Sequence, residues 1–197
     1  MASSRNTLIR SLHDLGAAAW FGGSLMGAIG VNGSSREVKD PAERATVASA
    51  GWARWAPVSA AAIGAHLIGA AGLLLANRDR VRGQSGAGAN SVAKTVLTAA
   101  AIGTTTYSGI LGAKIATQAE STPVEGATVP SDGTPDDVAR LQQQQRILQW
   151  ITPVLTGGIL VLGAQQGEQQ RPAEQLRGRI RSAATSAAQR IPQPASS

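Results

Sequence analysis

The chain has 197 residues, 43% of them hydrophobic, no cysteine and a formal net charge of +6. The absence of cysteine excludes disulfides, thiolate metal sites and cysteine nucleophiles. Arginine outnumbers lysine by fifteen to three beside heavy use of alanine and glycine, a bias typical of a GC-rich genome. We therefore expect a bacterial source.

Four stretches nearly free of ionisable residues alternate with charged connectors. They are residues 12–31, 57–76, 95–113 and 147–164. At about 1.5 Å of rise per residue, each is long enough as a helix to cross a hydrocarbon core of about 30 Å. A soluble alanine-rich bundle would show a charged face opposite its apolar stripe, and these stretches lack one. The sequence predicts an all-α fold, with four transmembrane helices in a single domain over residues 1–170.

The first stretch carries a spaced motif. Six residues separate His13 from Trp20, and one residue separates Trp20 from the pair Gly22 and Gly23. This arrangement resembles a signature in the first helix of the copper-resistance protein D (CopD) membrane domain and of related four-helix bacterial membrane proteins. The resemblance implies a helical bundle in the cytoplasmic membrane and a role in copper handling.

The first outer connector contains a helix-start signal. Asp40 is a suitable N-cap, Pro41 suits the first helical position, and Glu43 places an acid in the first turn. We expect a short helix here, lying on the membrane surface.

The two histidines are predicted to lie at different depths. His66 precedes the inner end of its helix by ten residues, or about 15 Å, whereas His13 lies about 2 Å inside the hydrocarbon. The predicted separation is about 13 Å, or about 7 Å if the first helix begins near Leu8, and it argues against both rings binding one haem iron. The same reckoning brings Thr105, Tyr107 and Thr156 near the level of His66. This midplane layer is interpreted either as a histidine satisfied by hydroxyl groups or as a small polar site for a proton, metal or ligand.

Two charged residues fall near one another at the inner surface. Asp14 begins the first helix and Lys94 enters the third, so a salt bridge between these helices is predicted.

The last part of the chain combines a polar helix with a basic tail. Residues 118–133 are rich in Pro, Thr, Gly and acids, which predicts an irregular loop, and Thr134 to Asp137 then repeat the helix-start signature. We expect a helical extension that leads into the fourth span. Residues 171–197 are interpreted as a basic cytoplasmic tail, which is either an amphipathic segment suited to anionic lipid of the inner leaflet or a frayed, solvated end. Without interleaved aromatics, the tail does not point to nucleic acid.

Charge sets the predicted orientation. Eleven basic residues fall on the side of the termini, whereas the other side has seven, which share their loops with eight acids. The positive-inside rule then places both termini in the cytoplasm. Trp52, Trp55 and Trp150 fall at the outer ends of their helices, where an aromatic belt is expected.

No nucleophile, base and orienting group occur at plausible spacings, so we expect no enzyme. The favoured function is a structural or assembly component of the bacterial cell envelope, a multi-pass protein of the cell membrane that contacts the lipid bilayer and other membrane proteins or its own copies. One alternative is a small transporter or channel element around His66, and another is a metal- or haem-binding membrane subunit. No cofactor is identified and no metal site is assigned. The polar candidates for a ligand site are His13, Asp14, His66, Lys94, Thr105 and Tyr107.

Overall fold

A computed structural model describes residues 7–76 and 85–169, and this part of the chain is helical apart from its connectors. Within it the one β-type pairing is an isolated bridge between Gly126 and Val129. Met1–Leu160 forms one compact unit and Val161–Ser197 a second. The all-α fold expected from the sequence is confirmed.

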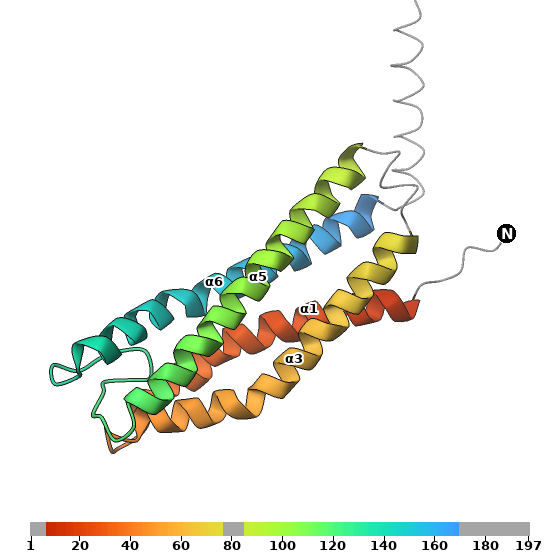
Figure 1. Cartoon of the computed structure of the whole chain (residues 1–197). Helices are drawn as coiled ribbons and strands as arrows, with labels where there is room; N and C mark the ends of the chain where they lie inside the picture. The colour runs from red at the N-terminus through yellow and green to blue at the C-terminus, as the bar shows by residue number, and fades with distance from the viewer. Residues whose placement is uncertain (1–6, 77–84, 170–197) are drawn as a thin grey trace, which may run out of the picture. The chain divides into compact units, whose positions relative to one another are not determined.

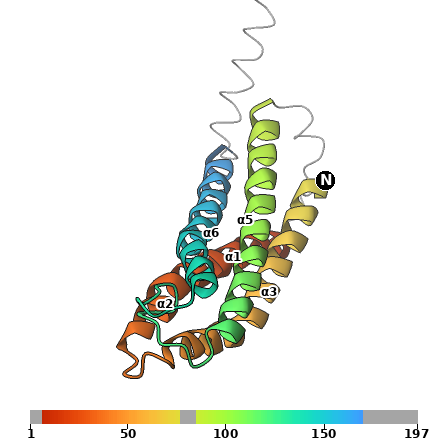
Figure 2. The same cartoon turned by 60° about the vertical axis from the view of Figure 1, so that its left-hand side comes forward.

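The first two long helices form an antiparallel pair. Helix α1 (Thr7–Met26) and helix α3 (Arg44–Ala76) lie side by side in Figures 1 and 2. Helix α3 bends along its length (Figure 1), and Pro57, which has no N–H to donate, lies inside it.

Three short helical turns lead from α1 toward α3. They are the π-helical turn η1 (Gly27–Val31), the single turn α2 (Asn32–Ser34) and the 3₁₀ turn η2 (Ser35–Glu37). The backbone stays in the right-handed helical region from Met26 through Ser35, so η1 continues the axis of α1 instead of starting a new element.

The other two long helices are α5 (Ser85–Gln118) and α6 (Asp136–Gln169). Between them lies an irregular segment of turns, as the sequence predicts for residues 118–133. The predicted helical extension is also confirmed, because α6 begins at Asp136 and runs without interruption through its polar first turns into the apolar part of the helix. The basic tail, residues 171–197, lies outside the described residues.

Within residues 7–76 and 85–169, three helices are long and apolar enough to cross a membrane. They are Arg44–Ala76, Ala89–Gln118 and Asp136–Gln165. Helices of this length and composition are typical of an integral membrane protein. In the described part of the chain α1 does not join these three, because Arg10, His13 and Asp14 occupy its first half. Its longest apolar stretch is instead shared with η1.

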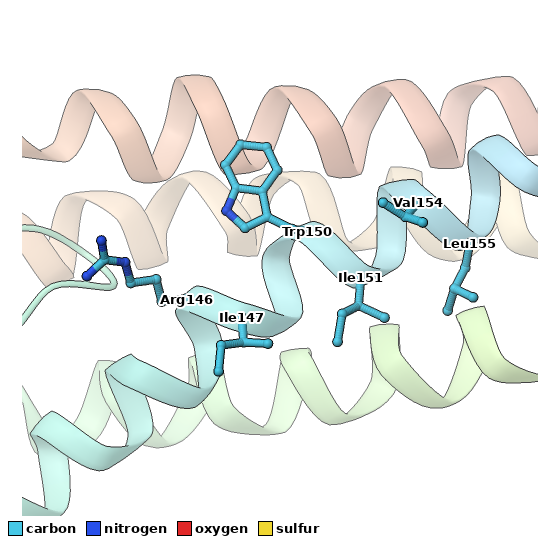
Figure 3. Close-up of a pocket in the computed structure, with 6 residues that line it drawn as sticks. All are labelled: Arg146, Ile147, Trp150, Ile151, Val154 and Leu155. Atoms are coloured by element: carbon cyan, nitrogen blue, oxygen red, sulfur yellow. The ribbon is translucent and has the colours of Figure 1, made fainter.

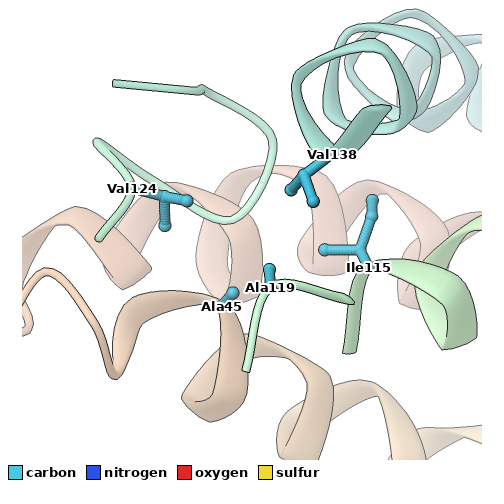
Figure 4. Packing of buried hydrophobic residues seen from close by; sticks show 5 residues of the cluster. All are labelled: Ala45, Ile115, Ala119, Val124 and Val138. Carbon is cyan, nitrogen blue, oxygen red and sulfur yellow. The ribbon is translucent and has the colours of Figure 1, made fainter. Parts of the chain in front are cut away.

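The connectors 32–44 and 119–137 fold together, and we call this region the loop cap. A small apolar core lies beneath it, made of Ala45, Ile115, Ala119, Val124 and Val138 (Figure 4). The two connectors are joined directly, since the Val124 N–H donates to the Pro41 carbonyl at 3.1 Å. The core residues come from α3, α5, α6 and the connector between the last two, so the loop cap links these helices.

Side chains complete the loop cap by bonding to its backbone. Arg44 donates through Nε to the Val38 carbonyl at 2.9 Å, and through Nη1 to the carbonyls of Val124 and Glu125 at 3.2 and 3.1 Å. The buried Gln142 amide donates to the Gly126 carbonyl at 3.0 Å. These bonds satisfy carbonyls that an irregular segment leaves without a ladder partner.

The separate surface helix predicted from Asp40, Pro41 and Glu43 is wrong. The Asp40 carboxylate accepts from the Ala42 N–H at 2.9 Å, as a helix-start residue does, and the Val47 N–H donates to the Glu43 carbonyl at 2.9 Å. The helix that starts here is α3 itself. The alanine-rich sequence after Glu43 offers no stop signal before the apolar stretch, so one helix forms instead of two.

Candidate functional site: a buried histidine pair

Glycine lies on both sides of the closest contact between α1 and α3. A Cβ atom built on Gly16 would lie 2.5 Å from the Ala62 carbonyl oxygen and 2.6 Å from the His66 amide nitrogen. A Cβ atom on Gly69 would likewise collide with the backbone of His13. Each glycine stands three residues after a histidine, so two His-x-x-Gly segments face one another in opposite directions. The helix backbones touch because neither glycine has a side chain.

Two further glycines, Gly23 of α1 and Gly27 of η1, lie against tryptophan side chains of α3. A Cβ atom on Gly23 would overlap the Trp55 indole, and one on Gly27 would overlap the Trp52 indole. Trp52 and Trp55, read from the sequence as an aromatic belt, pack instead against η1 and α1, in space that these glycines leave open.

The two histidines meet at this crossing. His66 is 1% exposed and His13 is 4% exposed, and their ring centroids are 4.4 Å apart with the planes tilted by 40°. His66 Nδ1 donates to the His13 backbone carbonyl at 3.1 Å. His13 Nδ1 donates to the Asp14 carboxylate at 2.7 Å. We call these two residues the histidine pair.

The partners of the histidine pair fix its tautomers. A carbonyl and a carboxylate only accept hydrogen bonds, so each ring carries its hydrogen on Nδ1. In the neutral form Nε2 of each ring then offers a lone pair. For His66 the nearest hydroxyl is that of Thr98 on α5, 3.4 Å from Nε2. The pair therefore connects three helices.

Two charged side chains flank the histidine pair. The Asp14 side chain is 56% exposed, and Lys94 on α5 is half-buried. The charge of Lys94 acts on both histidines, and that of Asp14 acts on Lys94. The structure thus brings four of the predicted polar candidates together. The Asp14–Lys94 salt bridge itself stays a prediction.

The predicted separation of the two histidines by about 13 Å is wrong. That value assumed that the first hydrocarbon-facing residue of each helix could be read from its charges. The register of α1 against α3 is set instead by the contact between Gly16 and the turn from Ala62 to His66. Because of this contact, His13 lies at the level of His66, and the charges at the helix ends do not determine its position.

His66 meets a threonine hydroxyl of another helix, as one interpretation of the midplane layer expects, but the predicted members Thr105 and Tyr107 are wrong. The α5 hydroxyl nearest to His66 belongs to Thr98, whereas Thr105, two turns further along α5, accepts from Trp20 Nε1 at 3.0 Å. Tyr107 is 47% exposed and donates to the Gln144 side chain at 2.9 Å. Thr105 and Tyr107 therefore make no hydrogen bond to the histidine pair, and Thr98 is the α5 residue that does.

An apolar cluster lies next to the histidine pair. It consists of Ala17, Trp20, Ala101 and Ile159, with Leu97 and Leu155 among its partly buried neighbours. On α5 the cluster residue Ala101 stands between Thr98 and Thr104, and Thr104 accepts from Thr152 at 3.2 Å. The polar side chains of the interior are thus divided into two groups by apolar packing.

The histidine pair has part of the chemistry of a metal site. Metal-binding histidines usually donate Nδ1–H to a carboxylate or a carbonyl, as both rings do here. In the described residues no group of three or more His, Cys, Asp or Glu side chains is placed to hold a metal ion. A haem iron held by both rings would require a porphyrin between them, and rings 4.4 Å apart leave no room for it.

Sequence reasoning missed Gly16 and Thr98. The signal for Gly16 was present, because both helices contain His-x-x-Gly and a repeated small residue beside a buried polar one indicates a close crossing. Thr98 had no such signal.

Comparison of the chain with protein-family models, curated proteins and solved structures finds no match.

Proposed function

We propose that this chain is a non-enzymatic structural or assembly component of a bacterial cell envelope, a four-span protein of the cell membrane with both termini in the cytoplasm. Three helices able to span a membrane support this proposal, with α1 and η1 together as the fourth span. The excess of basic residues on the side of the termini supports the orientation.

The observation that carries the proposal is the use made of buried polar side chains. Several of them bond to a helix other than their own: His66 to α1, Trp20 to α5, and Gln145 to Ser108 of α5 at 2.6 Å. Asn32 donates to Gln149 of α6 at 2.9 Å and accepts from Trp52 of α3 at 2.8 Å. Polar groups bonded to one another between helices hold the bundle together, which is what a scaffold requires.

The loop cap provides the surface that such a scaffold would present. Its backbone carbonyls are held by Arg44 and Gln142 from two different helices, so its conformation is fixed. Exposed acids such as Glu37, Glu120 and Asp132 lie on it. We propose that this surface contacts another membrane protein of the envelope.

Site-specific photocrosslinking in cells tests the assembly role. A photoreactive residue in place of Glu120, on the loop cap, should give a discrete crosslinked adduct with another membrane protein. A matched residue in place of the exposed Val92 of α5 should give none, or lipid adducts only. Adducts from Val92 alone, with none from Glu120 or Asp132, would contradict a docking role for the loop cap.

A second candidate function is metal binding by the histidine pair. It is favoured by the Nδ1–H bonds that both rings donate, which leave the Nε2 lone pair of His13 available, while that of His66 accepts from the Thr98 hydroxyl at 3.4 Å. Metal analysis and a visible absorption spectrum of the purified full chain decide between the candidates. Near-stoichiometric metal that is lost in His66→Asn, a variant that retains a donor, would favour metal binding over the scaffold. Metal far below one equivalent per chain would reject it.

A further inference from the structure

An exposed groove follows one stretch of α6. It has a volume of about 520 Å³ and is lined by Arg146, Ile147, Trp150, Ile151, Val154 and Leu155. Figure 3 shows these side chains in order along the helix, with Arg146 at one end and Leu155 at the other. Arg146 is the only charged residue among them. The groove therefore has one cationic end and an otherwise apolar length.

The groove lies where α6 passes from polar to apolar sequence. Before Arg146 come four consecutive glutamines, and after it the apolar stretch 147–164 begins. From Arg146 to Leu155 the helix rises by nine steps, or about 13.5 Å, which is close to the depth of one leaflet of a hydrocarbon core about 30 Å thick. Trp150 is 46% exposed within this region, as expected for a tryptophan at a membrane interface.

Exposure and charge identify what the groove is suited to hold. Val154 is 73% exposed and Ile147 is 65% exposed, so protein does not cover this face in the unit formed by Met1–Leu160. In the described residues the Arg146 guanidinium makes no hydrogen bond or ion pair. A guanidinium presents paired N–H donors that match a phosphate, and the apolar length below it matches an acyl chain.

We propose that this groove binds a phospholipid, with its phosphate on Arg146 and one acyl chain along Ile147, Ile151 and Val154. Trp150 lies at the level of the lipid's glycerol region. The site is distinct from the histidine pair and from the loop cap surface, and it does not depend on what either of them does.

Native mass spectrometry of the full chain, reconstituted with phosphatidylglycerol and released in mild detergent, tests the proposal. The wild-type chain should retain one phospholipid. Arg146→Gln should bind it about tenfold more weakly, because one charge-assisted contact is lost. The matched control is Arg140→Gln, which removes the same charge from an exposed position on the same helix outside the groove and should retain the lipid.

A second variant tests the apolar length. Val154→Trp fills the groove without changing charge and should also displace the lipid, while the thermal transition in detergent stays near that of the wild type. Equal retention by Arg146→Gln and the wild type, or equal loss in Arg140→Gln, would overturn the proposal. So would a lipid-free dimer that Val154→Trp converts to monomer, because a second copy would then occupy the groove.

Discussion

The crossing of α1 and α3 and the loop cap hold helices together by opposite means. At the crossing, Gly16 and Gly69 bring two backbones into contact, and the histidine pair fills the space beside them. In the loop cap the backbones stay apart, and the long Arg44 and Gln142 side chains reach across to carbonyls. The crossing depends on the absence of side chains at two glycines, whereas the loop cap depends on long polar side chains.

This difference teaches how a chain rich in alanine and glycine stays folded. Each of the two buried clusters has only a few fully buried residues, and alanine is among them, so apolar packing alone gives limited stabilisation in either region. Within a membrane, van der Waals contact between close backbones replaces the hydrophobic effect. Outside it, hydrogen bonds that satisfy loop carbonyls serve instead. Substitutions should therefore act differently in the two regions.

The largest expected effect is at the crossing. Gly16→Ala places a Cβ atom 2.5 Å from the Ala62 carbonyl oxygen, and because backbone atoms cannot rotate away, the helices must separate. We expect the free energy of unfolding in mixed micelles to fall by about 3 kcal/mol. The matched control is Gly22→Ala, on the same helix, where a Cβ atom meets nothing within 4 Å. It should be neutral or stabilising by up to about 1 kcal/mol. Equal losses in both variants would refute the close crossing.

The next effect is in the loop cap. Arg44→Ala removes three hydrogen bonds to backbone carbonyls. We expect a loss of about 2 kcal/mol in stability, since Arg44 is half-buried and water replaces some of these bonds. Hydrogen exchange should accelerate in residues 119–130 and stay unchanged around the histidine pair. Arg54→Ala, at an exposed position of the same helix, is the control. Accelerated exchange at the crossing in Arg44→Ala would show that the two regions are not independent.

A smaller effect tests the charges beside the histidine pair. Lys94→Met should lower stability by about 1 kcal/mol because Asp14 loses a neighbouring cation. Asp14→Asn, which still accepts from His13, should reduce that loss in the double variant. Thermal unfolding of the four proteins of this cycle measures the coupling. Additive losses would rule out the predicted Asp14–Lys94 pairing.

The smallest effect concerns the hydrogen bond between Trp20 and Thr105. Thr105→Val keeps the shape of the side chain and removes the acceptor of the Trp20 N–H. The cost should be about 0.6 kcal/mol, as is usual for hydrogen bonds between membrane helices. Thr106→Val, at the exposed neighbouring position, should cost nothing measurable. A loss above that of Gly16→Ala would mean that side-chain bonds, and not backbone contact, dominate near the crossing.

The sequence was sufficient for the elements but not for their register. The start of α6 after Thr134 and Pro135 followed from local capping chemistry, which depends only on neighbouring residues. The start signal at Asp40 was read correctly as a helix start. It was wrongly assigned to a separate element, because whether a helix stops depends on what it packs against.

The candidate site shows the same limit. His13, Asp14, His66 and Lys94 could be singled out because ionisable residues are rare in such stretches. Their grouping could not be derived from distances along the chain, since a helix pair can slide by a turn without changing either sequence. Gly16 fixes the register of α1 against α3, and the packing of α5 on α3, which brings Thr98 and not Thr105 to His66, had no comparable signal in the sequence.

The crossing of α1 and α3 can form before the rest of the site has been synthesised. These two helices are neighbours in sequence, so the carbonyl that accepts from His66 has already left the ribosome when His66 emerges. Thr98 and Lys94 arrive only with α5. A nascent chain stalled after Ala76 should therefore enter the membrane as a closed hairpin with its rings already in contact, and the later helices would dock onto a surface that exists before them.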